Sequence, residues 1–323
     1  LARYHESHGV SRRDRLFAHS GTLYRLGSGW GAPLVNAVAQ TRPLRRALGL
    51  ATERRLPELA RESFMHWWRR TGPRQERGPA LALLIDPFTN YNHPEVAVAA
   101  TQFFAAAGLS VRPVAADDGR AAISKGLVRE ARRAAERTIA ALEPLVSAGL
   151  PVVGLEPSSL LTLRDEYLYL LPDDRPTAAL AEAAVTFEEY VDRLVARGEL
   201  DVSFAGPSRR VLLHGHCHQK ALVGTGPARR ILALPGHTVE EVDSGCCGMA
   251  GSFGYEAEHY AISMQMAERR LLPAVRAAAA DTIVVAAGTS CRQQIAHGAD
   301  RAALHPAQVL RDALGVGKGN RMA

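Results

Sequence analysis

Residues 81–323 contain the same succession of structural signals twice. Each copy begins with a short apolar run typical of a buried strand. It continues through a polar loop, a helix, a second strand, a glycine-containing loop, a long helix and a third strand. The predicted strands are residues 81–85, 109–114 and 151–155 in the first copy, and 211–213, 238–242 and 282–286 in the second. Because strands that alternate with helices form mainly parallel sheets, the sequence predicts an α/β fold with two pseudo-symmetric parallel-sheet repeats.

Residues 1–80 differ from the rest of the chain in both charge and pattern. They hold 15 Arg and six acidic residues, a balance of +9, whereas residues 81–323 hold 24 Lys and Arg and 27 acids, a balance of −3. All three Trp residues (Trp30, Trp67 and Trp68) also precede residue 80, where apolar groups recur at helical spacing. Since the basic charge belongs to one segment, it argues against a nucleic-acid-binding protein.

These differences suggest three parts. We expect residues 1–80 to be a helical, basic segment that docks on upstream domains absent from this chain, because the chain begins at Leu1 rather than Met. Residues 81–200 are then the first repeat and residues 201–323 the second. No apolar run approaches the roughly 18–20 residues of a membrane span, and no secretory signal is present. We expect a cytoplasmic protein, with a place at the inner face of the membrane left open.

Helix signals add more detailed expectations. Pro94 can open a helix that ends before Gly108, and residues 125–148, 178–198 and 256–280 each read as one helix. Arg120 and Lys125 lie close in sequence to Asp117 and Asp118. We expect these four residues to form a surface ion network.

The four cysteines all lie in the second repeat, and each follows a predicted strand. Cys217, the Cys246-Cys247 pair and Cys291 span 75 positions. In open α/β sheets, sites gather beyond the carboxyl ends of the strands, so these side chains can converge. Aligning the repeats places Asp86-Pro87 opposite His216-Cys217, Asp117-Asp118 opposite Cys246-Cys247, and Ser159 opposite Cys291. The first repeat therefore has no thiol at the four matched places.

Clustered thiols in this pattern indicate a metal or redox site. Thiolates are soft ligands that suit iron–sulfur clusters or zinc, and a zinc site or free buried thiols remain alternatives from the residues alone. His216 and His218 flank Cys217 and are candidate additional ligands. Gly245, Gly248 and Gly251 around the cysteine pair allow the backbone to approach a cluster closely.

These motifs closely resemble the cysteine-rich CCG domain. That domain occurs in the B subunit of heterodisulfide reductase, in glycolate oxidase iron–sulfur subunits and in the C subunit of anaerobic glycerol-3-phosphate dehydrogenase. The resemblance is nearest to the C-terminal iron–sulfur region of single-chain FAD-linked oxidases of D-lactate or D-2-hydroxyglutarate dehydrogenase type. The residues that carry it are HGHCHQK at 214–220, DSGCCGMAGSFG at 243–254 and GTSCR at 288–292, with DPFTNY at 86–91, ISKG at 123–126 and GLEPSSLLTLRDE at 154–166 in the first repeat.

The resemblance implies an electron-transfer role. It implies a [4Fe–4S] cluster held by Cys217, Cys246, Cys247 and Cys291, and an FAD in an upstream domain that oxidises a D-2-hydroxy acid such as D-lactate, glycolate or D-2-hydroxyglutarate. The implied partners are flavin and ferredoxin-like domains, in the same polypeptide or in separate subunits, and a downstream electron acceptor. The rivals are a zinc-binding assembly module without redox chemistry and a cluster-free scaffold domain.

This chain also departs from the family pattern. The first repeat has Asp117-Asp118-Gly119-Arg120 where the family often has Cys-Cys-Gly-Arg, and Ser159 where Glu-Pro-Ser-Cys is frequent. We therefore expect no cluster in the first repeat. Gly288 replaces the first cysteine of a final Cys-x-x-Cys, which leaves four thiols, the number that one ordinary [4Fe–4S] cluster needs.

Overall fold

The apolar runs form two parallel sheets in a computed structural model that describes residues 2–73 and 78–315. The first sheet has the strand order β2-β1-β3-β4, and the second has the order β6-β5-β7. The strands are β1 (Ala80–Ile85), β2 (Ser110–Ala115), β3 (Val152–Gly154), β4 (Ala184–Thr186), β5 (Arg210–His214), β6 (Thr238–Glu241) and β7 (Ile283–Ala286). In both sheets the first strand of the repeat is central, with the second and third on either side. The predicted α/β fold with two parallel sheets is therefore confirmed.

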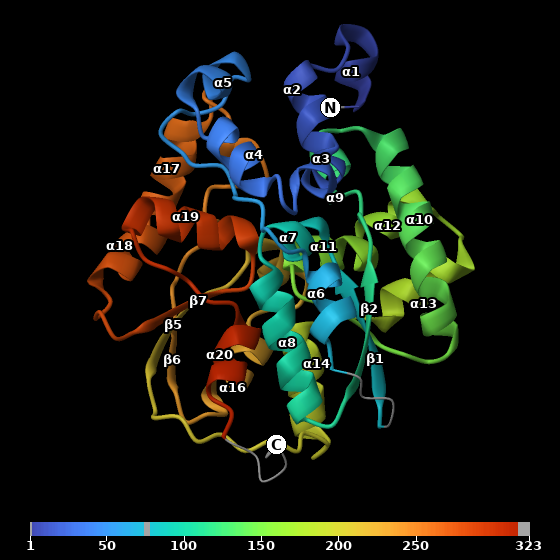
Figure 1. Cartoon of the computed structure of the whole chain (residues 1–323), viewed down its shortest axis with the longest axis vertical. Coiled ribbons are helices and arrows are strands. Elements are labelled where there is room, and N and C mark those ends of the chain that lie inside the picture. The colour runs from blue at the N-terminus through green and yellow to red at the C-terminus, as the bar shows by residue number, and fades with distance from the viewer. Residues whose placement is uncertain (1, 74–77, 316–323) are drawn as a thin grey trace.

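Helices cover both faces of each sheet (Figure 1). In the first repeat they are α7 (Pro87–Tyr91), α8 (Pro94–Ala106), α9 (Arg120–Ser124), α10 (Val128–Ser147), α11 (Pro157–Arg164), α12 (Glu166–Leu170), α13 (Arg175–Ala183) and α14 (Phe187–Ala196). In the second they are α15 (Cys217–Leu222), α16 (Gly226–Ala233), α17 (Tyr260–Glu268), α18 (Leu271–Ala277), α19 (Thr289–Ala299) and α20 (Pro306–Asp312). The predicted helix that starts at Pro94 is confirmed.

The helix predicted over 125–148 is confirmed as α10 with a later start, and two other predicted helices are interrupted. The helix expected over 125–148 begins only at Val128, because α9 closes before it. The expected helix 178–198 is wrong, because Val185 pairs with Val153 in β4 and Thr186 then caps the next helix by accepting a hydrogen bond from the Glu189 N–H. The expected helix 256–280 breaks between α17 and α18, near Pro273, since a proline ring clashes with the carbonyl four residues earlier.

The two sheets share one hydrophobic core. Alternate residues of β1 point to opposite faces: Leu81 and Leu83 join the core between the sheets, whereas Ala82 and Leu84 pack on the α10 side. From the second sheet, Val211 and Leu213 enter the same shared core. Helices α8, α14, α16 and α20 fill the space between the sheets, where α8 packs on α20 and α14 on α16 (Figure 1). The two repeats are therefore packed into one body rather than linked loosely.

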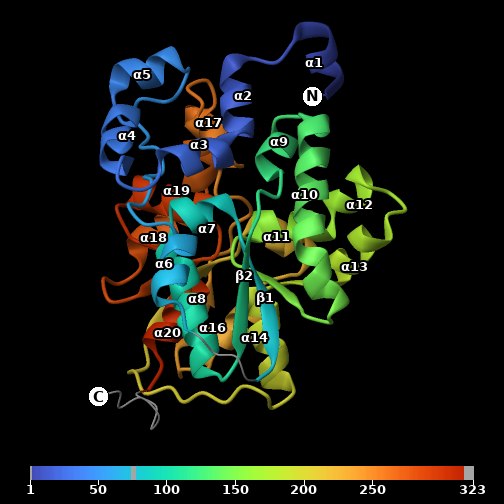
Figure 2. The same ribbon diagram turned by 45° about the vertical axis from the view of Figure 1, so that its right-hand side comes forward.

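The N-terminal segment is helical, as predicted; its first five helices lie on the carboxyl-end side of the sheets, and its sixth packs beside α7 and α8 (Figure 2). Its helices are α1 (Ala2–His8), α2 (Arg12–Ala18), α3 (Ser20–Gly27), α4 (Ala32–Ala39), α5 (Arg42–Ala47) and α6 (Phe64–Thr71). Helix α2 contacts α9 and α3 contacts α7, while Leu50 pairs with Glu256 of the second repeat. In the part of the chain that the structure describes, no helix is long and apolar enough to cross a membrane.

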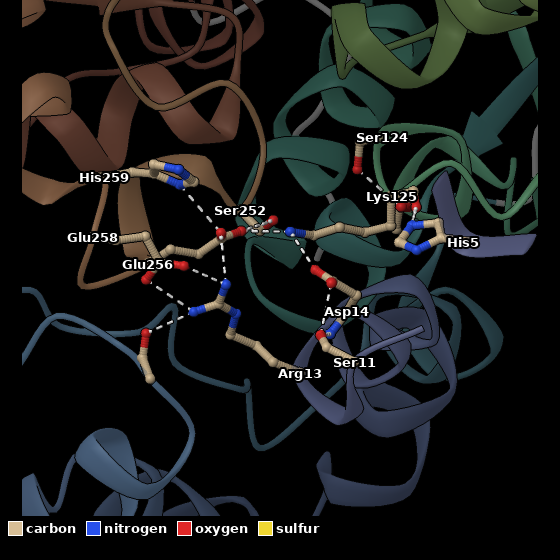
Figure 3. A network of polar contacts seen from close by, with 12 residues as sticks. His5, Ser11, Arg13, Asp14, Ser124, Lys125, Ser252, Glu256, Glu258 and His259 are labelled. Carbon is tan, nitrogen blue, oxygen red and sulfur yellow. Dashed lines mark hydrogen bonds and ion pairs between the residues drawn. The ribbon is translucent and has the colours of Figure 1, made fainter. Parts of the chain in front are cut away.

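A buried ion network joins the N-terminal segment to both repeats (Figure 3). The Glu256 carboxylate is almost completely buried and accepts hydrogen bonds from Lys125, from Arg13 at 3.2 Å and from Ser252 at 3.1 Å. Lys125 also pairs with Asp14 at 3.0 Å. These three hydrogen-bond donors thus come from the first repeat, the N-terminal segment and the second repeat, and His259 of the second repeat adds a contact of 3.2 Å.

The expected ion network around Asp117 and Asp118 is wrong. Arg120 pairs with Glu166, and Lys125 points to the Asp14 and Glu256 carboxylates instead. The reason is that the N-terminal segment and the second repeat bring carboxylates that lie far away in sequence to these two cations.

Glu256→Ala should destabilise the protein and release helix α2. The substitution leaves the cations of Lys125 and Arg13 partly buried without their shared partner, which costs about 3 kcal/mol in the free energy of unfolding. Chemical denaturation measures the loss, and amide exchange over residues 12–18 reports the release.

The control is Glu258→Ala. Glu258 also binds Arg13, but half of its side chain is exposed, so we expect a loss below about 1 kcal/mol. Equal losses in the two variants would contradict a central role for the Glu256 carboxylate.

Candidate metal centre

The four cysteines lie together at the carboxyl ends of β5, β6 and β7. Cys217 is the first residue of α15 and follows closely on β5, which ends at His214. Cys246 and Cys247 occupy the loop after β6, and Cys291 lies in the first turn of α19 after β7. Parallel pairing of the three strands directs these segments to one edge of the sheet.

The four thiols form a continuous array. Side-chain hydrogen-bond contacts join Cys217 to Cys246, Cys246 to Cys247, and Cys247 to Cys291. Cys247 and Cys291 are buried, Cys246 is half-buried and Cys217 is exposed. Residues that lie far apart in sequence are thus brought to one place, with one open side at Cys217.

The contacts between neighbouring thiols change the pKa values of the four cysteines in opposite directions. The hydrogen bond from Cys217 lowers the pKa of Cys246, and the hydrogen bond from Cys247 lowers the pKa of Cys291. The same contacts raise the pKa of Cys217 and of Cys247. A lowered pKa favours the thiolate, which is the form that binds metal.

His214 is the functional candidate that sequence reasoning missed as a ligand. One of its ring nitrogens, the Cys247 sulfur and the Cys291 sulfur lie within 4.8 Å of one another. Its Nδ1 is 2.8 Å from the Ser244 hydroxyl, and its buried Nε2 has no nitrogen or oxygen partner among the described residues. Its position as the last residue of the strand before Cys217 is the signal that could have identified it.

The two predicted histidines have other contacts. His216 is buried beside the array, where its Nδ1 accepts a hydrogen bond from the His218 N–H and so caps α15. His218 points to the first repeat, with Nε2 3.9 Å from the Glu166 carboxylate. His216 is thus close to the thiols but already serves as a helix cap.

Two glycines allow the loops to close around the array. Gly248 has φ +87°, and a Cβ there would lie 2.2 Å from the Ser263 carbonyl oxygen. A Cβ on Gly288 would lie 2.4 Å from the His216 ring and 3.4 Å from the Cys291 sulfur. Side chains at these positions would displace the cysteine-bearing segments, so the backbone itself forms the wall of the site.

The donor set fits an iron–sulfur cluster and also a zinc ion. Four sulfur atoms and one histidine nitrogen are soft or borderline donors, which suit either group. The Gly248 N–H lies 3.3 Å from the Cys246 sulfur, a contact of the kind that tunes cluster potentials.

The first repeat keeps one contact that matches the centre, but not its cysteine ligands. The Ser159 hydroxyl is in hydrogen-bond contact with the Asp118 carboxylate, which matches the Cys247–Cys291 contact in the second repeat. Both residues are buried, while Asp117 is exposed. Burial, followed by the nearby Asp117 charge, raises the pKa of Asp118 to about 7. Burial and the Glu156 charge raise the pKa of Asp86 to about 6. Asp86 is the residue that aligns with His216 of the second repeat.

A cavity of about 400 Å³ opens beside the thiols. Its wall combines residues of the second repeat with Arg120, Glu156 and Ser158 of the first repeat, and with Phe17 and Tyr24 of the N-terminal helices. All three parts of the chain therefore line the space that borders the cysteines.

Asp118→Asn should stabilise the protein at high pH and have little effect at low pH. The raised pKa means that the folded protein holds the Asp118 proton more tightly than the unfolded chain. The protonated Asp118 therefore contributes to the free energy of unfolding. This contribution is fully present below about pH 4 and is lost as the pH rises through about 7. One pKa unit corresponds to about 1.4 kcal/mol, so we expect a gain on the order of 3 kcal/mol above pH 8. Chemical denaturation at pH 4, 6 and 8 measures it.

Asp117→Asn is the matched control, because its side chain is exposed. It should give a smaller gain than Asp118→Asn at high pH, because it removes only the nearby charge that raises the Asp118 pKa and leaves the buried carboxyl group in place. A pH-independent effect of Asp118→Asn would show that its carboxyl group is not the buried acid described here.

No protein-family model matches the chain. Comparisons with individual proteins find similar chains that are named as dehydrogenases. The C subunit of anaerobic glycerol-3-phosphate dehydrogenase from Escherichia coli K12 is 26% identical over 313 residues, which cover 94% of this chain and 78% of the relative. D-2-hydroxyglutarate dehydrogenase from the same strain is 27% identical over 241 residues, 73% of this chain and 23% of the relative. The enzyme of that name from Pseudomonas putida KT2440 is 27% identical over 313 residues, 91% of this chain and 28% of the relative.

The chain thus spans about three quarters of the first relative and about a quarter of the D-2-hydroxyglutarate dehydrogenases. These matches confirm the resemblance to the iron–sulfur regions of FAD-linked oxidases that the cysteine motifs predicted. The chain is a homologue of the C subunit of anaerobic glycerol-3-phosphate dehydrogenase and of D-2-hydroxyglutarate dehydrogenase.

Proposed function

We propose that the chain transfers electrons through one [4Fe–4S] cluster bound by Cys217, Cys246, Cys247 and Cys291. The observation that carries this proposal is the continuous contact of four thiols from three separate loops. When bound, such a cluster accepts and returns single electrons. The two lowered thiol pKa values and the Gly248 N–H favour negative charge on the sulfurs.

The relatives favour redox chemistry over a zinc site. Both kinds of relative are named as dehydrogenases, and zinc has no redox chemistry. Two rival functions remain. Zinc in the purified protein would favour a zinc-binding assembly module, and the absence of any metal would favour a cluster-free scaffold.

Substrate oxidation belongs, in this proposal, to a flavin-bearing partner that acts on a D-2-hydroxy acid. The D-2-hydroxyglutarate dehydrogenases are about four times longer than the region that they share with this chain, so they contain much polypeptide that this chain does not match. We infer that comparable flavin and ferredoxin-like domains, within one polypeptide or as subunits, deliver electrons to the thiol-bound cluster. A downstream acceptor then removes them.

The surface of α3, α4 and α5 is the proposed docking site for the flavin-bearing partner. Residues 15–52 contain five Arg and no Asp or Glu, so they attract an acidic surface. Trp30 is fully exposed, and Leu26 and Leu34 are each more than two-thirds exposed; exposed apolar groups gathered in this way mark interaction sites. Trp67 and Trp68 are partly buried against the shared core instead, so the proposed surface centres on Trp30.

Cys246→Ser should lower the iron content and bleach the broad visible absorbance of protein purified without oxygen. Serine oxygen is a poor substitute for thiolate on iron. In the flavin-containing assembly, this variant should leave flavin reduction by substrate intact and slow delivery to an external acceptor at least tenfold. Elemental analysis, stopped-flow absorbance and steady-state acceptor reduction make these measurements.

Asp118→Ala is the control in the first repeat and should keep both iron and electron delivery. Zinc in place of iron in the unmodified protein would overturn the cluster assignment. Equal loss of flavin reduction and acceptor reduction in Cys246→Ser would overturn the relay.

Changing Trp30 and Leu34 together to Ser should release the chain from its flavin-bearing partner. Both side chains point to solvent, so the fold and the iron content should not change. Co-purification of flavin absorbance with the chain measures the association. Ile262→Ser removes a half-exposed apolar side chain from the second repeat and should retain the partner; loss of flavin in both variants would reject this docking surface.

A further inference from the structure

The carboxylate of Glu156 belongs to the cysteine-free repeat but extends into the metal centre of the other repeat. Glu156 follows β3 and caps α11, where one oxygen accepts hydrogen bonds from the Ser158 N–H at 3.4 Å and the Ser158 hydroxyl at 2.8 Å. The residue is 4% exposed. Its matched place in the second repeat is Gly288, which precedes α19.

The second oxygen of Glu156 caps the helix that carries Cys291. Its Oε2 accepts a hydrogen bond of 2.7 Å from the backbone N–H of Thr289, which is 133 positions away in sequence and is the first residue of α19. The first N–H groups of a helix have no partner within the helix. One carboxylate therefore caps two helices, one in each repeat, and the second of them holds a proposed ligand two residues later.

The second repeat has no room to supply this cap itself. A side chain on Gly288 would collide with His216 and approach the Cys291 sulfur, as its Cβ distances of 2.4 and 3.4 Å show. Gly288 therefore gives α19 no side-chain cap. Glu156 supplies the missing acceptor from across the interface between the repeats.

The Glu156 carboxylate also brings a fixed negative charge. Burial opposes the charge, but His216, the Thr289 N–H and Arg292 together hold the pKa of Glu156 below its ordinary value. His216 precedes Cys217, and Arg292 follows Cys291 and is itself buried. The charge thus lies among the immediate neighbours of two of the four cysteines.

We propose that Glu156 is a positioning residue for the metal centre, holding the Cys291 turn in place and placing a negative charge beside the bound cluster. This inference rests on the proposed cluster. The hydrogen bond to Thr289 limits the movement of the first turn of α19. The charge opposes the addition of an electron nearby, since like charges repel strongly in a buried environment, and so it lowers the reduction potential.

Two substitutions separate these effects. Glu156→Gln keeps an oxygen that can accept the Thr289 hydrogen bond but removes the charge. It should shift the midpoint potential of the reconstituted cluster to more positive values, while iron content stays unchanged. Glu156→Ala removes both functions and should in addition lower iron retention. A redox titration followed by visible absorbance or electron paramagnetic resonance measures the potential.

Iron-free protein tests the positioning without any cluster. In Glu156→Ala, alkylation of Cys291 and amide exchange of Thr289 should become several-fold faster, and Glu156→Gln should restore both rates to near those of the unmodified protein. If Glu156→Ala does not fold, the midpoint potential and the exchange rates of Glu156→Gln test the proposed role of Glu156 instead.

Glu189→Gln is the matched control. Glu189 is also a largely buried carboxylate that caps a helix of the first repeat, α14, but its hydrogen bonds go to Arg164 and Thr186 of the same repeat. It should change neither the potential nor the Cys291 rate. An unchanged potential in Glu156→Gln, or an unchanged Cys291 rate in Glu156→Ala, would overturn the proposal. Absence of iron from the unmodified protein would instead reject the proposed function, and the iron-free rates would still decide the positioning role.

Discussion

Parallel pairing of β5, β6 and β7 is the constraint on which the candidate metal centre depends. Every strand of this sheet runs in the same direction, so the loops that follow the strands all emerge at one edge. Cys217, the Cys246-Cys247 pair and Cys291 each lie beyond a strand, and the sheet brings these three distant segments together. The close approach of backbone at Gly248 and Gly288 completes the enclosure.

The first repeat has the same order of central and flanking strands as the second, but no thiols at the matched positions. The Asp118–Ser159 contact retains the pairing of Cys247 with Cys291, but a carboxyl group replaces a soft donor. Burial raises the pKa of this acid, and its oxygens are hard donors, so this side of the molecule lacks the thiolates that a soft metal needs. The repeat still contributes to the other site through the cavity wall and through Glu156. Its remaining role is therefore structural and electrostatic.

Repetition made much of the architecture predictable from sequence. The six expected strands, the parallel sheets and the helical N-terminal segment are all present, since they depend on local apolar runs and on the alternation of strands with helices. The strand β4 was missed because Ala184–Thr186 becomes a strand only by pairing with β3. The partners of Lys125 and the role of Glu156 depend on contacts 131 and 133 positions apart in sequence, which no local pattern contains. His214 was overlooked because the approach of its ring to the thiols becomes apparent only in the folded site.

The Glu256 network has a consequence for the order of assembly. Arg13 and Glu256 are 243 positions apart, so their contact closes about three quarters of the chain into a loop, and such long-range contacts slow folding. During synthesis, the N-terminal helices emerge long before the loops that carry the thiols. These helices must wait for the last third of the chain before they can settle over the cavity. Until this contact closes, the cavity that borders the cysteines lacks the wall that Phe17 and Tyr24 of these helices supply.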